Sequence, residues 1–195
     1  LLAGIYAMYF EWDMVKAERY ILRSIELNPN LYESHFILGW YRMIMQQRDK
    51  IAEPLNMAYK LDPLGGETVP GIDEINFFAG NIDIAEQYCD EGIRNYPNSM
   101  YANSMKALVV GGKGDWTSAL DSLANWGMLS GIPLFDGLIG YGKAMAGQTD
   151  SVYQTIDQML AIRESENAPP VGAVLALMYL GLGDKEKFYF YFEEA

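Results

Sequence analysis

The sequence predicts an all-α fold, a right-handed superhelical stack of about six helix pairs. Three prolines carry this prediction, because Pro29, Pro63 and Pro97 follow one another at intervals of 34 residues. A fixed period of this length is typical of stacked helical hairpins. A second recurring feature agrees with it, a small apolar residue early in the second helix of a unit. This position holds Ala17, Ala85 and Ala119, with Ile51 in the second unit.

Capping residues and apolar spacing predict the helices of the first half. The expected helices span 1–10, 13–27, 31–46, 49–61, 67–79 and 81–95. Asp13 is the expected N-cap of the second helix. Pro54 lies inside the fourth, so a kink or a late start is expected there. Gly39 lowers helix propensity by about 1 kcal/mol relative to alanine, so a neighbouring helix is expected to pack closely against it.

Helix 67–79 has the weakest sequence support, because Gly65, Gly66, Pro70 and Gly71 all oppose it. With Thr68 as cap, Pro70 falls in the first turn, where its missing amide hydrogen does no harm. The second half repeats the pattern more loosely, with expected helices at 98–110, 115–126, 133–147, 149–164, 171–182 and 185–194. One continuous array follows, in units 1–29, 30–63, 64–97, 98–131, 132–168 and 169–195. The chain opens inside an apolar helical stretch, so a fragment of a longer protein is expected.

The net charge of −12 is unevenly distributed. Residues 1–60 are balanced, whereas residues 61–97 carry eight acids against Arg94 alone. A negative field repels phosphate backbones, so we expect no direct binding to nucleic acid. The acidic stretch is interpreted as a solvated face, with a docking site for a basic partner as the alternative.

Cysteine content and the length of the apolar runs argue against a disulfide-bonded, metal-binding or membrane-spanning protein. Cys89 is the single cysteine, which excludes an internal disulfide, and no Cys/His cluster has metal-ligand spacing. We interpret Cys89 as a core residue rather than a reactive thiol. The longest apolar runs fall short of the ~20 residues that span a bilayer, and no signal peptide is visible. We expect a cytoplasmic location, or a periplasmic one if the chain is part of a membrane-anchored regulator.

These motifs resemble tetratricopeptide arrays, whose 34-residue units carry Leu-Gly in the first helix, alanine in the second and proline at the end. Leu38-Gly39 and Ile139-Gly140 match the first feature, and the alanines and prolines above match the others. The inter-helix turn is matched at Gly114-Asp115-Trp116, Gly147-Gln148-Thr149 and Gly183-Asp184. The resemblance covers the whole chain and is strongest over 1–63 and 80–130. It implies a non-catalytic scaffold that binds a protein or peptide.

A finer likeness concerns the opening and the end of the chain. Phe10-Glu11-Trp12-Asp13, Leu61-Asp62-Pro63-Leu64 and residues 178–185 look like the carboxy-terminal repeat regions of bacterial signalling proteins. Those regions follow a winged-helix DNA-binding domain or a nucleotide-cyclase domain. The likeness therefore implies an alternative function, a sensory or regulatory module of a transcription regulator or cyclase.

No catalytic constellation is apparent, so we expect no enzyme activity, no cofactor and no metal. The sole histidine, His35, has no nucleophile or metal companion and is interpreted as structural. The carboxylate pairs Asp73/Glu74, Glu164/Glu166 and Glu193/Glu194 are interpreted as solvated surface. Residues 111–114 superficially suggest a phosphate loop, but no strand precedes them and the spacing is wrong, so an inter-helix turn is expected.

In tetratricopeptide arrays the first helix of each pair lines a concave groove that binds partners. The register of this sequence places the following residues on or near that groove: Tyr6, Tyr9, Phe10, Phe36, Trp40, Met43, Phe77, Phe78, Tyr101, Met105, Tyr141 and Met145. The lysines and asparagines that clamp a terminal carboxylate in chaperone-binding members are not matched. An aromatic and methionine-rich groove suits an apolar or amphipathic segment. The alternative is that these side chains pack in the core. The apolar end units further suggest a homodimer.

Overall fold

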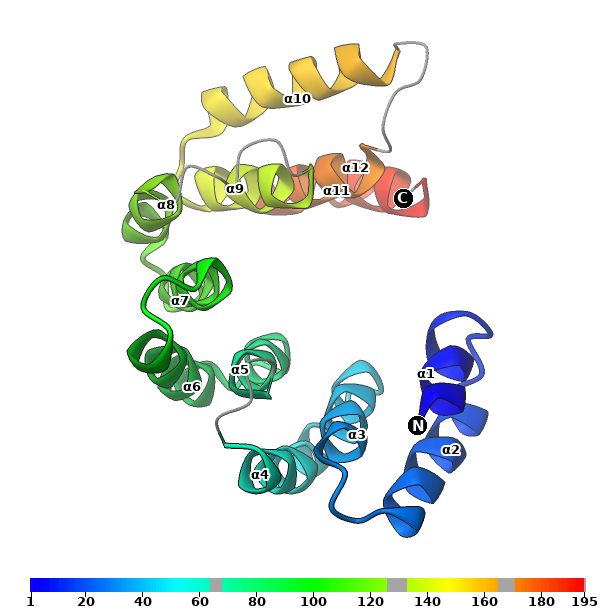
Figure 1. The fold of residues 1–195 in the computed structure, drawn as a ribbon. Helices are drawn as coiled ribbons and strands as arrows, with labels where there is room; N and C mark the ends of the chain where they lie inside the picture. Colours follow the sequence, from blue (N-terminus) through cyan, green and yellow to red (C-terminus); the bar gives the residue numbers. More distant parts are fainter. Residues whose placement is uncertain (64–67, 126–132, 165–170, 195) are drawn as a thin grey trace. The chain divides into compact units, whose positions relative to one another are not determined.

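The computed structural model describes residues 1–63, 68–125, 133–164 and 171–194. Within these ranges the chain forms twelve α-helices and one 3-10 helix, and no strand. The helices are α1 (Leu2–Tyr9), α2 (Met14–Leu27), α3 (Tyr32–Ile44), α4 (Ala52–Leu61), α5 (Thr68–Phe78), α6 (Ile82–Asn95), α7 (Met100–Gly112), α8 (Trp116–Asn125), α9 (Pro133–Met145), α10 (Thr149–Arg163), α11 (Gly172–Gly181) and α12 (Lys185–Glu193), with the 3-10 helix at Arg48–Lys50 (Figure 1). The predicted all-α fold of helix pairs is confirmed.

The chain divides into two compact units, Leu1–Met105 and Lys106–Ala195. The prediction of a single continuous array remains a prediction. Gly65 and Gly66, which precede the helix with the weakest sequence support, lie outside the described residues, as do Trp126 and Glu166.

The turn within each helix pair recurs with the predicted period. A residue with positive φ occupies the turn at Trp12, Gln46, Gly80 and Gly114, each 34 positions after the last, and again at Gly147 and Gly183. Glycine adopts this left-handed conformation without steric cost, whereas Trp12 and Gln46 hold it with a side chain. Gly111 and Gly112, predicted as part of this turn, belong instead to the end of α7.

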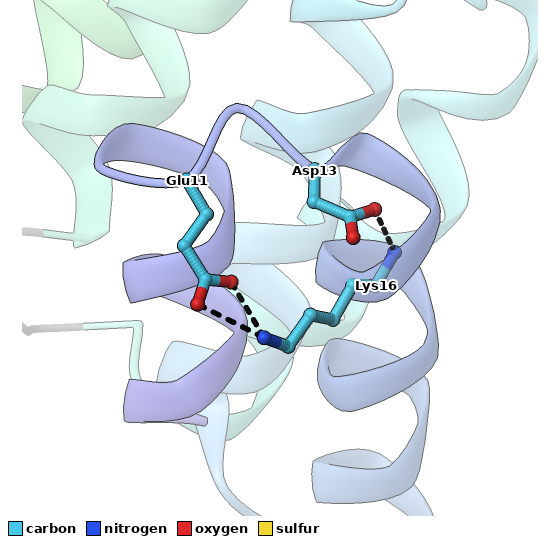
Figure 2. Close-up of polar contacts among 3 residues, drawn as sticks. All are labelled: Glu11, Asp13 and Lys16. Carbon is cyan, nitrogen blue, oxygen red and sulfur yellow. Dashed lines mark hydrogen bonds and ion pairs between the residues drawn. The ribbon is translucent and has the colours of Figure 1, made fainter.

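A capping residue follows the turn and starts the second helix. The Lys16 backbone N–H donates to Asp13 Oδ1 at 2.9 Å, as predicted, and the Lys16 ammonium also contacts Glu11 at 2.7 Å (Figure 2). Asp115 and Asp184 accept from the backbone N–H of Ser118 and Lys187 in the same way. Each carboxylate satisfies one of the free amides of a first helical turn.

Pro54 produces a late start rather than a kink. The backbone after Gln47 first forms the 3-10 turn Arg48–Lys50, and α4 begins at Ala52, so Pro54 lies in its first turn. Gly39 on α3 faces this helix: a Cβ there would come within 2.4 Å of Leu55 Cδ2. The predicted close packing of a helix against Gly39 is therefore confirmed.

In the first unit, α1, α3 and α5 form one layer and α2, α4 and α6 form the other (Figure 1). The predicted position early in the second helix is buried in the first four helix pairs, at Ala17, Ile51, Ala85 and Ala119. One core cluster joins α1, α2 and α3 around Met8 and Ile21, and a second joins α4 and α5 around Leu55 and Ile75. Trp40 of α3 packs against both clusters.

The second unit has its main core around α11. Val174, Leu175 and Met178 of this helix pack with Val152 and Ile156 of α10. Helix α12 buries Tyr191 but exposes Tyr189, Phe190 and Phe192. The homodimer expected from the apolar end units remains a prediction. No helix in the described part of the chain is both long and apolar enough to span a membrane.

Candidate partner-binding surface

The first helices of unit Leu1–Met105 present aromatic side chains to solvent. Five of the predicted groove residues are between 40% and 73% exposed: Tyr6, Tyr9, Phe10, Phe78 and Tyr101. Four are half-buried, namely Phe36, Trp40, Met43 and Phe77, and Met105 is buried. Tyr141 and Met145 belong to the second unit, where Tyr141 packs edge-on against Trp116 and Met145 is exposed. Some of the twelve residues are thus exposed to solvent, and others pack in the core.

The 34-residue register explains how these side chains are positioned. Tyr6, Trp40 and Glu74 occupy the same place in successive first helices, and so do Tyr9, Met43 and Phe77. Two of the aromatic contacts are local: the rings of Tyr6 and Phe10 stack at 5.2 Å, and those of Phe77 and Phe78 meet edge-on at 5.5 Å. Equivalent positions on adjacent repeats recur on one side of a helical array.

Tyr9, Trp40 and Glu74 come together although they lie on three different helices. The pKa of Tyr9 is raised by burial, lowered by the neighbouring indole of Trp40 and raised again by the Glu74 carboxylate. Among the described residues, the buried indole N–H of Trp40 has no hydrogen-bond partner that meets the geometric criteria. Through Trp40, helix α3 packs against core residues of both α1 and α5.

Asp73 is 1% exposed, so the prediction that Asp73/Glu74 is a solvated pair is wrong for Asp73. Helix α5 is an interior helix that packs on α3, α4 and α6, so it buries more than one face. Asp73 Oδ2 lies 3.3 Å from the Cys89 Sγ donor, and Oδ1 accepts from the Glu74 backbone N–H at 2.6 Å. Burial raises the pKa of Asp73 to about 7, and its contact with Cys89 partly opposes that rise. Cys89 itself is fully buried.

Glu74 links α5 to α7. The Tyr101 hydroxyl donates to Glu74 Oε2 at 2.8 Å. Burial is the main cause of a raised pKa at Tyr101, and the nearby Asp73 and Glu74 charges raise it further. The phenol therefore stays protonated and holds the carboxylate on the exposed side of α5.

Acidic side chains dominate this side of the unit. Helices α1 and α5 contain no Lys or Arg, and residues 100–105 of α7 contain none either. Lys106 follows, about 140° around α7 from Tyr101. The one arginine of α3, Arg42, turns toward α2 and contacts Glu18 at 2.6 Å. Glu33, seven residues before Trp40 on α3, has a buried carboxylate oxygen with no hydrogen-bond partner among the described residues.

Two hollows lie elsewhere. One, of about 330 Å³, lies between α2, α3 and α4 and is lined by Leu22, Leu38, Arg42, Lys50 and Met57 among others. His35 also borders it, and its Nε2 is 2.8 Å from the Pro29 carbonyl oxygen, in keeping with a structural role. The other, of about 350 Å³, lies beside Leu120 and Ile139 in the second unit. Within the described ranges, no three His, Cys, Asp or Glu side chains gather closely enough to hold a metal ion.

Sequence reasoning missed Glu33 and Glu74 as members of this surface. The repeat period is the signal for Glu74, because this residue follows Trp40 by 34 positions. The local charge of residues 61–97 was recognised without its distribution over the helix faces. Helix α5 carries two acids of this segment, the buried Asp73 and the more exposed Glu74, whereas α6 carries four.

No protein-family model matches the chain. No curated protein matches it either. Among solved structures, it is similar to the crystal structure of PilW, described as a widely conserved type IV pilus biogenesis factor, with a TM-score of 0.71 and 17% sequence identity. The similarity covers 96% of this chain and 86% of the PilW chain. It supports a tetratricopeptide-like helical repeat fold. The finer likeness to bacterial regulators and cyclases remains a prediction.

Proposed function

We propose that this protein is a non-catalytic scaffold that binds a protein or peptide through the first helices of unit Leu1–Met105. The first-helix surface, as we call it, comprises Tyr6, Tyr9, Phe10, Glu33, Phe36, Trp40, Met43, Glu74, Phe77, Phe78 and Tyr101. One observation carries the proposal: five aromatic side chains that would gain free energy from burial stay exposed on α1, α5 and α7 or directly after α1. Clusters of exposed apolar side chains are typical of interaction sites on soluble proteins. Phe36, Trp40 and Phe77 belong to the same surface and are half-buried, so a bound partner could also contact them.

A selection from a displayed library of helical peptides tests this function. The affinity of each selected peptide is then measured for the wild-type chain and for the Phe10→Ala and Phe78→Ala variants. These substitutions truncate exposed rings without opening the core. We expect each substitution to weaken binding by roughly tenfold, since aromatic anchors dominate interface energies. Val15→Ala and Leu27→Ala are matched controls, because both remove exposed apolar side chains from α2.

Binding that is equally sensitive to the α2 variants would contradict the proposal, and so would a selection that yields no binder. Far-UV circular dichroism of each variant shows that helical content is retained.

The alternative function, a sensory or regulatory module of a bacterial transcription regulator or cyclase, rests on the sequence likeness at residues 10–13, 61–64 and 178–185. The complete coding sequence tests it. A winged-helix or cyclase domain in the same polypeptide would favour this function, and the absence of such a domain would remove it.

A further inference from the structure

We propose that the partner of the first-helix surface is a cationic amphipathic segment of another protein, one that carries lysine or arginine beside an apolar face. This inference rests on the proposed function and specifies the chemistry of the partner. It follows from the charges and the unpaired polar atoms that lie among the exposed aromatic side chains.

The charge of the surface has one sign. Glu33 and Glu74 flank the aromatic residues, and Asp73 lies beneath Glu74. Among the described residues of α1, α3 and α5, Arg42 is the one lysine or arginine, and it pairs with Glu18 of α2. An acidic segment or a terminal carboxylate would meet repulsion here, whereas lysine and arginine would meet complementary charge.

Two buried polar atoms on α3 lack partners among the described residues, and both are on the same face of this helix. They are Glu33 Oε2, which can only accept while ionised, and Trp40 Nε1, which can only donate. Seven residues separate them, about 10 Å along the helix. A cationic side chain would satisfy the first atom, and a carbonyl oxygen of the same segment would satisfy the second.

The exposed rings suit the rest of such a segment. The Tyr101 hydroxyl contacts the Glu74 carboxylate at 2.8 Å, so a cation paired with Glu74 would also lie near the Tyr101 phenol. Phe10 and Phe78 lie on the same layer and are more than half exposed. The methylene stems of lysine or arginine and neighbouring leucine-like side chains would cover them.

Three synthetic helical peptides of equal length and identical leucine face test the inference. Their polar faces are lysine, glutamine or glutamate, and their dissociation constants for the full chain are measured by isothermal titration calorimetry at low and at high salt. We expect the lysine peptide to bind tightest, the glutamate peptide weakest, and the preference for lysine to shrink at high salt.

Variants separate a local effect from attraction to the net charge. Glu74→Gln keeps an acceptor for the Tyr101 hydroxyl, and Glu33→Gln keeps the shape of its side chain. We expect either substitution to lower the affinity for the lysine peptide by roughly threefold to tenfold and to leave the affinity for the glutamine peptide unchanged. Glu26→Gln on α2 removes the same charge from an exposed position and is the matched control.

Equal effects of Glu74→Gln and Glu26→Gln would overturn the inference, because binding would then follow net charge alone. If the glutamine peptide binds as tightly as the lysine peptide and loses affinity in Phe78→Ala, the inference fails while the proposed function stands. If no peptide binds, both fail.

Discussion

Asp73 is the residue that most directly couples this fold to pH. Its carboxyl lies between the Cys89 side chain of α6 and the backbone of its own helix, away from water. Burial raises its pKa from 3.8 to about 7, so the folded protein holds a proton that the unfolded chain releases. Below pH 3.8 both states are protonated and the fold bears no penalty. The penalty grows as the pH rises toward 7 and is complete above it.

The free energy of unfolding of the Asp73→Asn variant should therefore depend less on pH than that of the wild-type protein. Each pKa unit corresponds to about 1.4 kcal/mol, so wild type should lose on the order of 3 kcal/mol of unfolding free energy from this residue between pH 4 and pH 7. The asparagine variant should lack that loss and be the more stable protein at pH 8. Urea unfolding at several pH values measures both, and Asp157→Asn, on the exposed side of α10, is the control. Parallel pH profiles for wild type and Asp73→Asn would show that Asp73 is not the cause.

At the scale of a helix, the turn and cap fix where each second helix begins. Asp13 accepts from the Lys16 backbone N–H, as Figure 2 shows, and Asp115 and Asp184 repeat this contact in later pairs. The recurring cap follows a turn residue with positive φ, so the chain reverses and restarts the helix within a few residues.

Loss of the Asp13 cap should destabilise the first unit measurably. Asp13→Ala leaves one first-turn amide without its acceptor and should lower the free energy of unfolding by about 1 kcal/mol. Asp13→Asn keeps an acceptor oxygen and should lose much less. Chemical denaturation monitored by circular dichroism distinguishes the two, and an identical loss for both would assign the effect to charge rather than to the cap.

Most elements could be predicted because their signals are local. The prolines that follow the second helices, the Asp13 cap and Pro54 in a first turn each act within a few residues, and the structure follows them. The position of Asp73 could not be predicted in the same way. Its burial depends on the packing of α5 on α3, α4 and α6, and its contact with Cys89 joins residues 16 positions apart. No local pattern distinguishes a solvated carboxylate from one that neighbouring helices cover. The exposed aromatic residues on the first helices share this difficulty.

At the scale of the whole molecule, each helix pair contacts mainly the helix pairs next to it in sequence. Helix pairs α1–α2, α3–α4 and α5–α6 pack within the first unit, and α11 packs on α9 and α12 within the second. Stability in such arrays is close to a sum of repeat and interface contributions. A local defect should therefore remain local.

Gly39→Ala tests this by placing a methyl group where α4 packs on α3. The new Cβ would meet Leu55 Cδ2 at 2.4 Å and should cost about 1–3 kcal/mol. Hydrogen exchange followed by mass spectrometry should show faster exchange in residues 1–105 than in wild type, with residues 106–195 much less affected. Gly92→Ala is the matched control, because its Cβ would meet Ala102 at an ordinary 3.5 Å. Uniformly faster exchange over the whole chain would indicate a single cooperative unit.

Cys89 gives the molecule an internal reporter of such openings. It is the only thiol of the chain, and in the folded state its sulfur is fully covered at the face where α6 packs on α5. A thiol reagent can reach it only after these two helices separate, so the labelling rate measures how often the middle of the first unit opens, without any engineered probe.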